Sequence, residues 1–476
     1  MERTSHAFKE SAVRALQDAT LQMALGNMRV GFVGKRQKAR ERLPEFERLC
    51  DLARDIKDHT LKHLDFYLEA FEARVKAQDG EVHWCRTPAE ARQVILEICQ
   101  RVEARTVTKG KSMIAEEIAL NEFLEANGIE PVETDLGEYI IQLAHEPPSH
   151  IIAPAIHKTR EQVSDLFFEH HRQYGKTRRL DETRALVDEA RQVLRPKYVA
   201  ADVGITGANF LVAETGSVVI VTNEGNSDLT RTLPKVHIVT ASIEKLVPNV
   251  EDVWTILRLL ARSATGQELS TYTTFASGPR QEGELDGPGE FHVVLLDNGR
   301  SDVLGTEFQD ILRCIRCAAC INHCPVYRAV GGHAYGWVYS GPMGAVLTPM
   351  LIGIEEAGHL PNASTFCGRC EAVCPMRIPL PRMMRHWRER EFEGGHSPPT
   401  FRRGIKLWAW LARHPRLYGP VMALAIGLMA RLAGRRRRFR VLPLAGGWTG
   451  SRDFPAPEGQ RFMAMWRARR AARGGP

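Results

Sequence analysis

The chain lacks several signals that would assign it to a familiar class. Residues 1–22 contain no basic start followed by an apolar core, so we expect no secretory signal there. No G-x-G-x-x-G motif opens a helix, and neither a P-loop nor a G-x-S-x-G motif occurs. Without these motifs the sequence does not support a nucleotide cofactor, although it does not exclude a flavin. Without a secretory signal it favours a cytoplasmic protein.

Cysteines are scarce outside one segment. Cys50, Cys85 and Cys99 are scattered, and the other seven lie between Cys314 and Cys374. In a chain of 476 residues, such clustering indicates metal binding in a reducing compartment rather than a disulfide framework.

Charge is distributed unevenly along the chain. Residues 375–476 contain 22 Lys and Arg against 5 Asp and Glu, whereas residues 1–374 contain 42 against 52. A basic end on an acidic body predicts an anionic partner, either a membrane face or an acidic protein. The alternative is a solvated, arginine-rich tail. The tail has no helix-turn-helix or zinc-finger pattern, so we expect no nucleic acid partner.

Within this basic end, residues 417–430 carry no charge over 14 positions. This stretch is shorter than the roughly 20 apolar residues of a spanning helix. It predicts a helix that is buried or packed against a partner. The alternatives are an interfacial helix with arginines on lipid headgroups and, less favoured, a membrane span.

The pattern of apolar residues changes at Thr106. Residues 1–104 read as helices with polar connections, for example over 8–26 and 46–77. From Thr106 short apolar runs alternate with helical stretches, which predicts an α/β domain with a largely parallel sheet. The expected elements are strands at 106–108, 129–133, 236–239 and 291–296, a strand pair within 207–223, helices at 112–127 and 252–262, and a surface loop at 277–289.

The first cysteine motif, CIRCAACINHCP at residues 314–325, has the C-x2-C-x2-C-x3-C-P spacing of bacterial ferredoxins. Two-residue gaps let a tight loop direct three thiolates to one cluster. The small Ala318 and Ala319 let the backbone approach that cluster. The fourth cysteine begins the next turn and is expected to point to a second cluster.

The second motif, CGRCEAVCP at residues 367–375, repeats this spacing with Ser364 in place of the first cysteine. The crossed ligation typical of such motifs predicts two iron–sulfur clusters. Cluster 1 takes Cys314, Cys317, Cys320 and Cys374, and cluster 2 takes Cys324, Cys367 and Cys370. These cysteines place an α-helical two-cluster ferredoxin-type domain at 304–380, after a helical region at 1–104 and an α/β domain at 105–303, and before a basic, Trp- and Arg-rich region at 381–476.

The fourth ligand of cluster 2 is open. The cluster is either [3Fe–4S], or [4Fe–4S] with Ser364, water or a remote residue, or it leaves an iron open to substrate. We favour an ordinary redox cluster because no acid–base pair stands nearby. Zinc is the competing metal, but seven cysteines do not form two four-cysteine sites. His323 could complete a zinc site, although a His beside a ligand is more often a supporting residue.

A weaker signal in the α/β domain predicts a small-anion site. Lys109 and Lys111 lie between a predicted strand and a helix, where backbone N–H groups can hold an anion. Glu214, Thr215 and Asn223 lie at predicted strand ends, where ligands of open α/β sheets gather. Turn formation and helix capping are the alternative roles of these residues.

Five further stretches carry a family resemblance: KGKSMIAEE at 109–117, TDLGEYII at 134–141, PAIHKT at 154–159, residues 204–226, and GGWTGSRDFPAP at 446–457. Together with the cysteine segment they resemble the lactate utilization protein B family over essentially the whole chain. This family provides the iron–sulfur member of a three-component bacterial L-lactate oxidation system.

The resemblance implies two [4Fe–4S] clusters on the seven cysteines and a role in oxidising L-lactate to pyruvate. It implies an α/β fold similar to that of sugar-phosphate isomerases and CoA transferases. It also implies two partners, a cysteine-rich protein resembling the glycolate oxidase iron–sulfur subunit and a smaller protein that shares the α/β domain.

Two functions follow as hypotheses. The first is an electron-transfer subunit, because lactate oxidation releases two electrons and each cluster carries one. Its basic region would dock a partner or the inner face of the membrane. The second is an enzyme whose α/β domain binds a small carboxylate or a CoA ester beside accessory clusters.

Overall fold

The computed structural model describes residues 3–442, 446–450 and 452–472. The chain forms two compact units, Met1–His396 and Ser397–Pro476, which are described separately. Residues 443–445, 451 and 473–476 of the predicted C-terminal region lie outside the described residues.

The first unit is built on a six-stranded sheet in the order β1-β10-β7-β4-β2-β3. Every neighbouring pair in this sheet is parallel. The strands β4, β7 and β10 are almost wholly buried, as expected for a parallel sheet covered on both faces. The prediction of a parallel α/β domain is confirmed, and the predicted strands correspond to β2 (Thr106–Lys109), β3 (Glu130–Glu133), β7 (Val236–Ser242) and β10 (Glu290–Leu296). The sheet also contains β1 (Glu81–Cys85) and β4 (Val203–Gly207), which were not predicted as strands.

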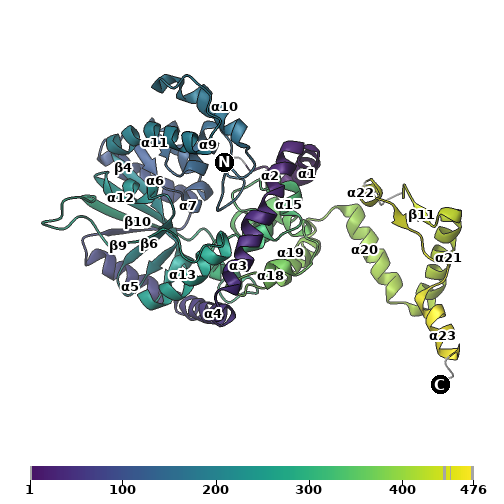
Figure 1. The fold of residues 1–476 in the computed structure, drawn as a ribbon. Coiled ribbons are helices and arrows are strands. Elements are labelled where there is room, and N and C mark those ends of the chain that lie inside the picture. Colours follow the sequence, from purple (N-terminus) through teal and green to yellow (C-terminus); the bar gives the residue numbers. More distant parts are fainter. Residues whose placement is uncertain (1–2, 443–445, 451, 473–476) are drawn as a thin grey trace. The chain divides into compact units, whose positions relative to one another are not determined.

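Alternate residues of the strands face two different cores. Val236 and Ile238 of β7 pack with helices α6, α7 and α8 on one face. Val239 and Ala241 pack on the other face with α5 and a second sheet. Figure 1 shows the helices around the strands. The helices that follow strands in this region are α6 (Pro88–Arg101), α7 (Met113–Glu117), α8 (Leu120–Ala126), α9 (Leu136–Leu143), α10 (Arg160–His170), α11 (Thr183–Ala200), α12 (Asn226–Thr232) and α13 (Val250–Ala264).

The second sheet has the order β8-β5-β6-β9. Its strands are β5 (Phe210–Val212), β6 (Ser217–Thr222), β8 (Leu246–Val247) and β9 (Tyr272–Ala276). The predicted strand pair within 207–223 is confirmed as the antiparallel pair β5 and β6. Gly216 turns the chain between them with φ of +67°, and a Cβ there would lie 2.8 Å from Val75 N. Only glycine suits this turn.

The N-terminal region is mostly helical, with one correction. The predicted helices at 8–26 and 46–77 each form two helices, and the first break occurs at Asp18, which accepts a hydrogen bond from the Leu21 N–H. The expectation of helices throughout 1–104 is wrong at β1, which pairs with β10 some 200 positions later. A five-residue edge strand has too short a pattern to be recognised without its distant partner. The helices are α1 (Phe8–Gln17), α2 (Ala19–Gly26), α3 (Lys35–Glu41), α4 (Phe46–Lys62) and α5 (Leu64–Lys76), with a π-helical turn over Arg29–Gly34.

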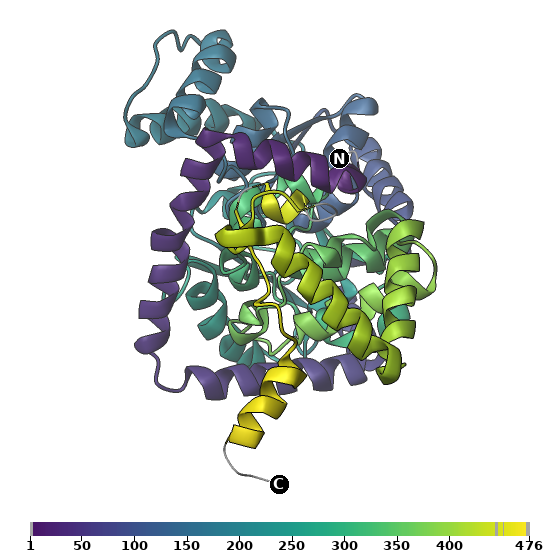
Figure 2. The same ribbon diagram turned by 90° about the vertical axis from the view of Figure 1, so that its right-hand side faces the viewer.

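The cysteine segment is helical, as predicted, and packs on the N-terminal helices. Arg36 donates to the Val373 carbonyl at 2.8 Å, and Gln22 donates to the Ala329 carbonyl at 2.8 Å. Figure 2 shows the N-terminal helices, in purple, along the periphery of the first unit. The helices of the segment are α14 (Ala319–Asn322), α15 (Tyr327–Val330), α16 (Gly341–Ile352), α17 (Ile354–Ala357), α18 (Arg369–Ala372) and α19 (Leu380–Glu393).

Helix α19 was predicted within the basic C-terminal region, but it belongs to the first unit. Trp387 stacks on Phe308 with ring centroids 4.2 Å apart and donates to the Val346 carbonyl at 3.0 Å. The apolar face of α19 completes the core under the cysteine segment, so the basic unit begins at Ser397.

The second unit contains α20 (Pro399–Ala412), α21 (Pro415–Ala433), α22 (Gly446–Thr449), α23 (Phe462–Ala472) and the short pair β11 (Arg438–Phe439) and β12 (Phe454–Pro455). Residues 415–436 form a helix long and apolar enough to cross a membrane by length and composition, with a mean hydropathy of 1.5. It exceeds the uncharged stretch because it includes arginines at both ends. Only 6% of its apolar window is buried, which excludes burial within the chain; packing against a partner, the other half of that prediction, stays a prediction.

Candidate iron–sulfur centre and adjoining pocket

The first cysteine motif winds tightly through two left-handed residues. Arg316 and Ala318 both have φ of 59°, and helix α14 begins directly after them. This winding brings Cys314, Cys317 and Cys320 to one small apolar cavity, which the distant Cys374 also lines. These are the four cysteines that spacing assigned to cluster 1.

The second motif has the same backbone at the same positions. Phe366 and Gly368 have φ of 53° and 75°, and helix α18 follows them. Cys324, Cys367 and Cys370 lie close enough for their charges to interact. Ser364 lies where the first motif has Cys314, and its Oγ accepts a hydrogen bond from the Phe366 N–H at 3.2 Å.

The spacing of the thiols tests which metal group fits. In a single-zinc site with Zn–S bonds of about 2.3 Å, the sulfur atoms lie about 3.8 Å apart. Among the described residues, no three cysteine sulfurs converge within 4.8 Å of one another, and all ten cysteines are free. The thiols therefore fit a larger, multi-iron group better than one ion.

Cys367 differs in burial and in acidity from buried thiols of both sets. Burial raises the pKa of Cys374 to about 11 and that of Cys370 to about 12, and it raises the pKa of Cys320 well above its usual range. The exposed Cys367 has a lowered pKa, because the Arg369 N–H and the Thr365 hydroxyl donate to it. A bound metal would hold the buried thiols as thiolates, since a coordinated thiol is deprotonated.

The three scattered cysteines have other environments. Cys85 and Cys99 lie in the core between α6 and the sheet. Cys50 is buried on α4, its pKa is raised to about 12 by burial, and Cys374 lies close enough to affect it. These contacts place none of the three scattered cysteines beside Cys324, Cys367 and Cys370. The structure therefore offers none of them as the fourth ligand of cluster 2.

A pocket of about 360 Å³ adjoins the first motif. It is lined by Ser112 after β2, by Asn209 after β4 and by Ser242 at the end of β7. Ile315, Arg316 and Tyr339 of the cysteine segment also line it. The α/β domain and the first cysteine motif therefore share one cavity, which sequence reasoning did not predict.

The predicted small-anion site is only partly present. Lys111 and Asn223 line the pocket, whereas Lys109, Glu214 and Thr215 lie outside it. Glu214 accepts a hydrogen bond from the Val250 N–H at the start of α13, and Thr215 Oγ1 accepts one from the Ser217 N–H. For these two residues, the capping and turn roles are the ones the structure shows.

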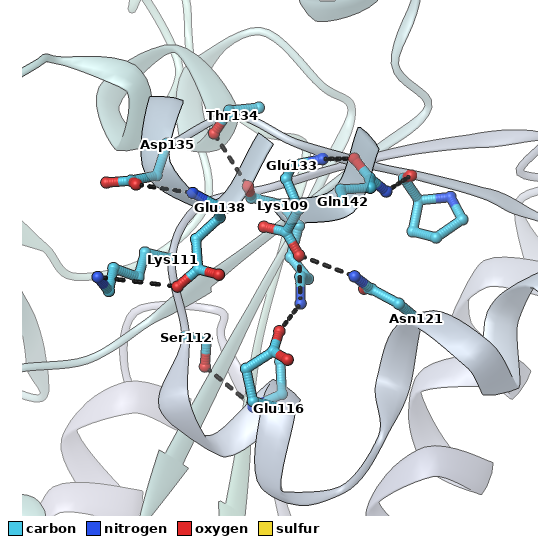
Figure 3. A network of polar contacts seen from close by, with 12 residues as sticks. Lys109, Lys111, Ser112, Glu116, Asn121, Glu133, Thr134, Asp135, Glu138 and Gln142 are labelled. Carbon is cyan, nitrogen blue, oxygen red and sulfur yellow. Dashed lines mark hydrogen bonds and ion pairs between the residues drawn. The ribbon is translucent and has the colours of Figure 1, made fainter. Parts of the chain in front are cut away.

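Lys109 is enclosed by carboxylates and is not available to a ligand. Its Nζ lies 2.8 Å from Glu116 Oε1 and 2.7 Å from Glu133 Oε1, and its side chain is 1% exposed (Figure 3). Burial alone would lower the Lys109 pKa, but the two carboxylates outweigh burial and raise it. Asn121 also donates to Glu133 at 2.8 Å. This network joins β2 and β3, so Lys109 is a structural residue.

A buried charge network links the pocket to the sheet domain. Arg300 donates to both oxygens of Glu117, at 3.0 and 2.7 Å, and Tyr339 donates to Glu117 at 2.6 Å. Glu244 forms ion pairs with Arg300 at 3.0 Å and with Arg316 at 3.1 Å. Burial would raise the Glu244 pKa, but the charges of Arg300, Arg316 and Lys245 lower it to about 2. Arg316 therefore ties the first cysteine motif to the α/β domain.

Sequence reasoning missed the charged residues of this region. Lys57 donates to the Leu246 carbonyl at 2.8 Å, and Lys245 lines the pocket. Their sequence surroundings look like ordinary amphipathic or loop positions. Arg316 could have been found, because it lies inside the motif between Cys314 and Cys317.

Two groups of His and Glu side chains also converge among the described residues. In one of them Glu146 accepts hydrogen bonds from His157 at 2.7 Å and from Lys158 at 2.5 Å. The other contains the exposed Glu81 with His83 and His292. The Glu146 carboxylate is satisfied within the chain, so the first group needs no metal to balance it.

Comparison with known proteins agrees with both parts of the site. Residues 68–296 match the LUD domain, and residues 310–378 match the 4Fe-4S dicluster domain. The second match contains all seven clustered cysteines, so it supports iron–sulfur clusters over zinc.

Curated relatives match over nearly the whole chain. Lactate utilization protein B of Anoxybacillus flavithermus is 43% identical over 96% of this chain and 96% of its own length. Lactate utilization protein B of Bacillus subtilis is 44% identical over 96% of this chain and 95% of its own length. A solved structure, a DUF162 family protein from Deinococcus radiodurans, covers 49% of this chain and 98% of its own at 14% identity and a TM-score of 0.27. By its relatives and its two domains, the chain belongs to the lactate utilization protein B family.

Proposed function

We propose that this protein is an electron-transfer subunit in the oxidation of L-lactate to pyruvate. The observation that carries the proposal is the pairing of two cysteine sites in one segment that matches a dicluster domain. The names of the relatives support the link to lactate. Bound iron–sulfur clusters would supply one-electron redox chemistry, so two of them suit a two-electron oxidation.

The residues around the first site would hold a cluster away from water. Cys314, Cys317, Cys320 and Cys374 would be its ligands, and the cavity that they line has an apolar wall formed by Met343, Met376, Ile378 and Leu380. Burial and hydrogen bonding are what tune the potential of such a centre. The second site differs because Cys367 is exposed. It would be the side on which electrons pass to or from a partner.

We propose two [4Fe–4S] clusters, the second held by Cys324, Cys367, Cys370 and a fourth group. Ser364 is the candidate for that group, since it lies at the missing cysteine position and carries a hydroxyl oxygen. A [3Fe–4S] cluster, which needs only three thiolates, is the competing form of the second cluster.

The second unit is proposed as the docking region. Trp408, Trp410 and Leu407 of α20 and Leu424 of α21 are large, exposed apolar side chains. Arginines flank them, and arginine with exposed tryptophan suits an acidic membrane surface. The chain would act in the cytoplasm, at the inner membrane face, with the two partners that the family resemblance implies.

The parallel sheet of the first unit supports the proposed likeness of the α/β domain to sugar-phosphate isomerases and CoA transferases.

A reconstituted system tests the proposal. L-lactate is added anaerobically to the purified chain alone and then together with the cysteine-rich protein and the smaller α/β protein of the same system. The expected result is bleaching of the iron–sulfur absorbance only when the partners are present. Lactate-driven pyruvate formation with partners at an undiminished rate when this chain is left out would contradict the proposal.

The pocket favours a second candidate function, a chain that itself binds a small carboxylate. The observation behind it is the continuity of the pocket with the first cysteine motif.

A further inference from the structure

The pocket lies where an open α/β sheet usually binds its ligand. In the sheet order, β2 has β3 on one side and β4 on the other, so the direction of strand addition reverses between β2 and β4. Ligands of such sheets bind outside the carboxyl ends of the strands at this reversal. Lys111 and Ser112 follow β2, and Ala208 and Asn209 follow β4, and all four line the pocket. Its volume of about 360 Å³ is within the range of small-molecule sites.

Two buried cations line this pocket with unused donors. Lys245 is 9% exposed, and no hydrogen bond or ion pair reaches its ammonium group from the residues that the structure describes. Arg316 is 8% exposed; its Nη2 pairs with Glu244, but its Nη1 is a buried atom without a hydrogen-bond partner. A buried donor or charge without a partner is costly, so a ligand that accepts from both would relieve that cost.

Charged groups of both signs line the pocket. They are Asp135, Glu224 and Lys111 together with Lys245 and Arg316. Glu244 pairs with Arg316, and Cys314 acts electrostatically on both Lys245 and Arg316. An anionic ligand is therefore favoured by the unused donors of Lys245 and Arg316 and not by the net charge of the region.

The rest of the wall is mixed. Phe32, Ile151, Ile152 and Leu260 form an apolar part, and Thr240, Ser242, Asn209 and Asn223 are among its polar side chains. A ligand that fits this wall has a carbon body, one anionic end and a polar substituent. A bare inorganic anion would leave the apolar part of the wall uncovered.

We propose that this pocket binds a small organic carboxylate, a 2-hydroxy or 2-oxo acid, with its carboxylate held by Lys245 and Arg316. Arg316 lies between Cys314 and Cys317, so the ligand contacts the loop that carries the first motif. The inference deepens the proposed function and rests on it for the class of acid. The α/β domain then has a task of its own, to hold an acid of the lactate oxidation reaction beside the first cluster site.

Calorimetric titration of the full chain, purified anaerobically with its iron, tests the inference. The probes are L-lactate, pyruvate, lactamide as the neutral analogue, and inorganic phosphate. We expect saturable binding of lactate or pyruvate, none of lactamide, and much weaker binding of phosphate. Equal binding of phosphate and pyruvate would overturn the assignment to an organic acid, and absence of binding by either acid would overturn the site.

Variants separate the pocket from the clusters. Lys245→Met is expected to weaken binding about tenfold or more, because a charged hydrogen bond is lost, while iron and sulfide per chain stay unchanged. Lys62→Met, an exposed lysine on α4, is the matched control and should bind like the unaltered chain. Arg316→Lys keeps the charge and should retain more affinity than Arg316→Met.

The reduction potential of the clusters distinguishes failure of the inference from failure of the proposed function. If Lys245→Met shifts the reduction potential while no acid binds to the unaltered chain, Lys245 acts on the potential of the cluster and not on a ligand. The pocket proposal is then wrong. If acid binds but the clusters cannot be reduced reversibly, the pocket stands and the electron-transfer role is wrong.

Discussion

Cys317 and Cys367 occupy equivalent positions in the two motifs, each between two residues with left-handed backbone, yet Cys317 is buried and Cys367 is exposed. The neighbouring positions differ in the same way. Arg316 is buried and paired with Glu244, whereas its counterpart Phe366 is 37% exposed and lies under Arg388. The spacing of the cysteines thus sets the loop, and the packing around the loop sets its environment.

This comparison suggests a division of labour. The first motif lines the pocket together with the α/β domain, and the second exposes Cys367 while Cys324 and Cys370 stay buried. A chain that moves electrons between a protected site and a partner needs one centre of each kind. The following predictions test whether the two motifs differ as this reading requires, from the largest expected effect to the smallest.

Replacing a half-buried ligand of the first cluster should do more damage than replacing the exposed ligand of the second. Cys320→Ser is expected to remove the first cluster and to unfold the segment from Phe308 to Leu380, because the cluster supplies much of its folding energy. Cys367→Ser should remove only the second cluster and leave the fold intact. Iron analysis and thermal unfolding measure both. A Cys320→Ser protein with full iron content would rule out the ligand assignment.

The buried charge network belongs to the first motif alone. Arg300→Met leaves Glu117 and Glu244 without their main partner and should lower the free energy of unfolding by about 3–5 kcal/mol. Arg101, which pairs with Glu290 at the surface, is the matched control, and Arg101→Met should cost about 0–1 kcal/mol. Denaturant unfolding compares them, and equal losses would show that the network does not anchor the motif.

Restoring the missing cysteine should make the second motif resemble the first. If the second cluster has three irons, Ser364→Cys should raise the iron content from about seven to about eight per chain. If it already has four, the iron content should stay the same and the EPR spectrum of the reduced cluster should change. No change in either measurement would place Ser364 outside the cluster's coordination. Ala363→Cys, one position earlier, controls for the mere addition of a thiol.

Carboxylate binding should depend on pH through Lys245. Burial, and next the charge of Arg316, lower the Lys245 pKa to about 8, while Glu244 and Cys314 act in the opposite direction. The ammonium group is charged below this value and neutral above it, so affinity for a carboxylate should fall above about pH 8, by up to about tenfold per pH unit. Titrations across this range measure the effect. The same decline in Lys245→Met would assign it to another group.

The smallest effect is expected for cysteines outside the motifs. Cys50→Ser, Cys85→Ser and Cys99→Ser should leave the iron content unchanged, since all three are buried away from the second site. Loss of iron in one of them would identify that cysteine as a ligand.

The sequence allowed much of the fold and the cysteine grouping to be predicted. Strands such as β7 and β10 were recognisable because a buried parallel strand is a run of apolar residues, and the ferredoxin spacing is local. The edge strand β1 was missed because its pairing with β10 is distant in sequence. For α21 the sequence left burial, packing against a partner and a membrane interface open, since an apolar helix looks the same whether or not it is covered, and the structure excludes only burial within the chain.

The pocket could not be predicted for a related reason. Lys111, Lys245 and Arg316 come from three separate regions and meet only after the sheet and the cysteine segment pack together. Lys109 was the more conspicuous lysine in its motif, but its two carboxylate partners come from α7 and β3. A charged residue's role depends on such partners, which spacing alone does not show.

Iron and acid-labile sulfide per chain, with low-temperature EPR before and after dithionite reduction, test the central claim most directly. The account predicts about eight irons per chain, or about seven if the second cluster has three. In either case the acid-labile sulfide should correspond to two clusters with about four sulfides each. The account also predicts that an added soluble paramagnet relaxes the signal of the second cluster more strongly than that of the first. Zinc without sulfide, or two signals equally sensitive to the paramagnet, would contradict it.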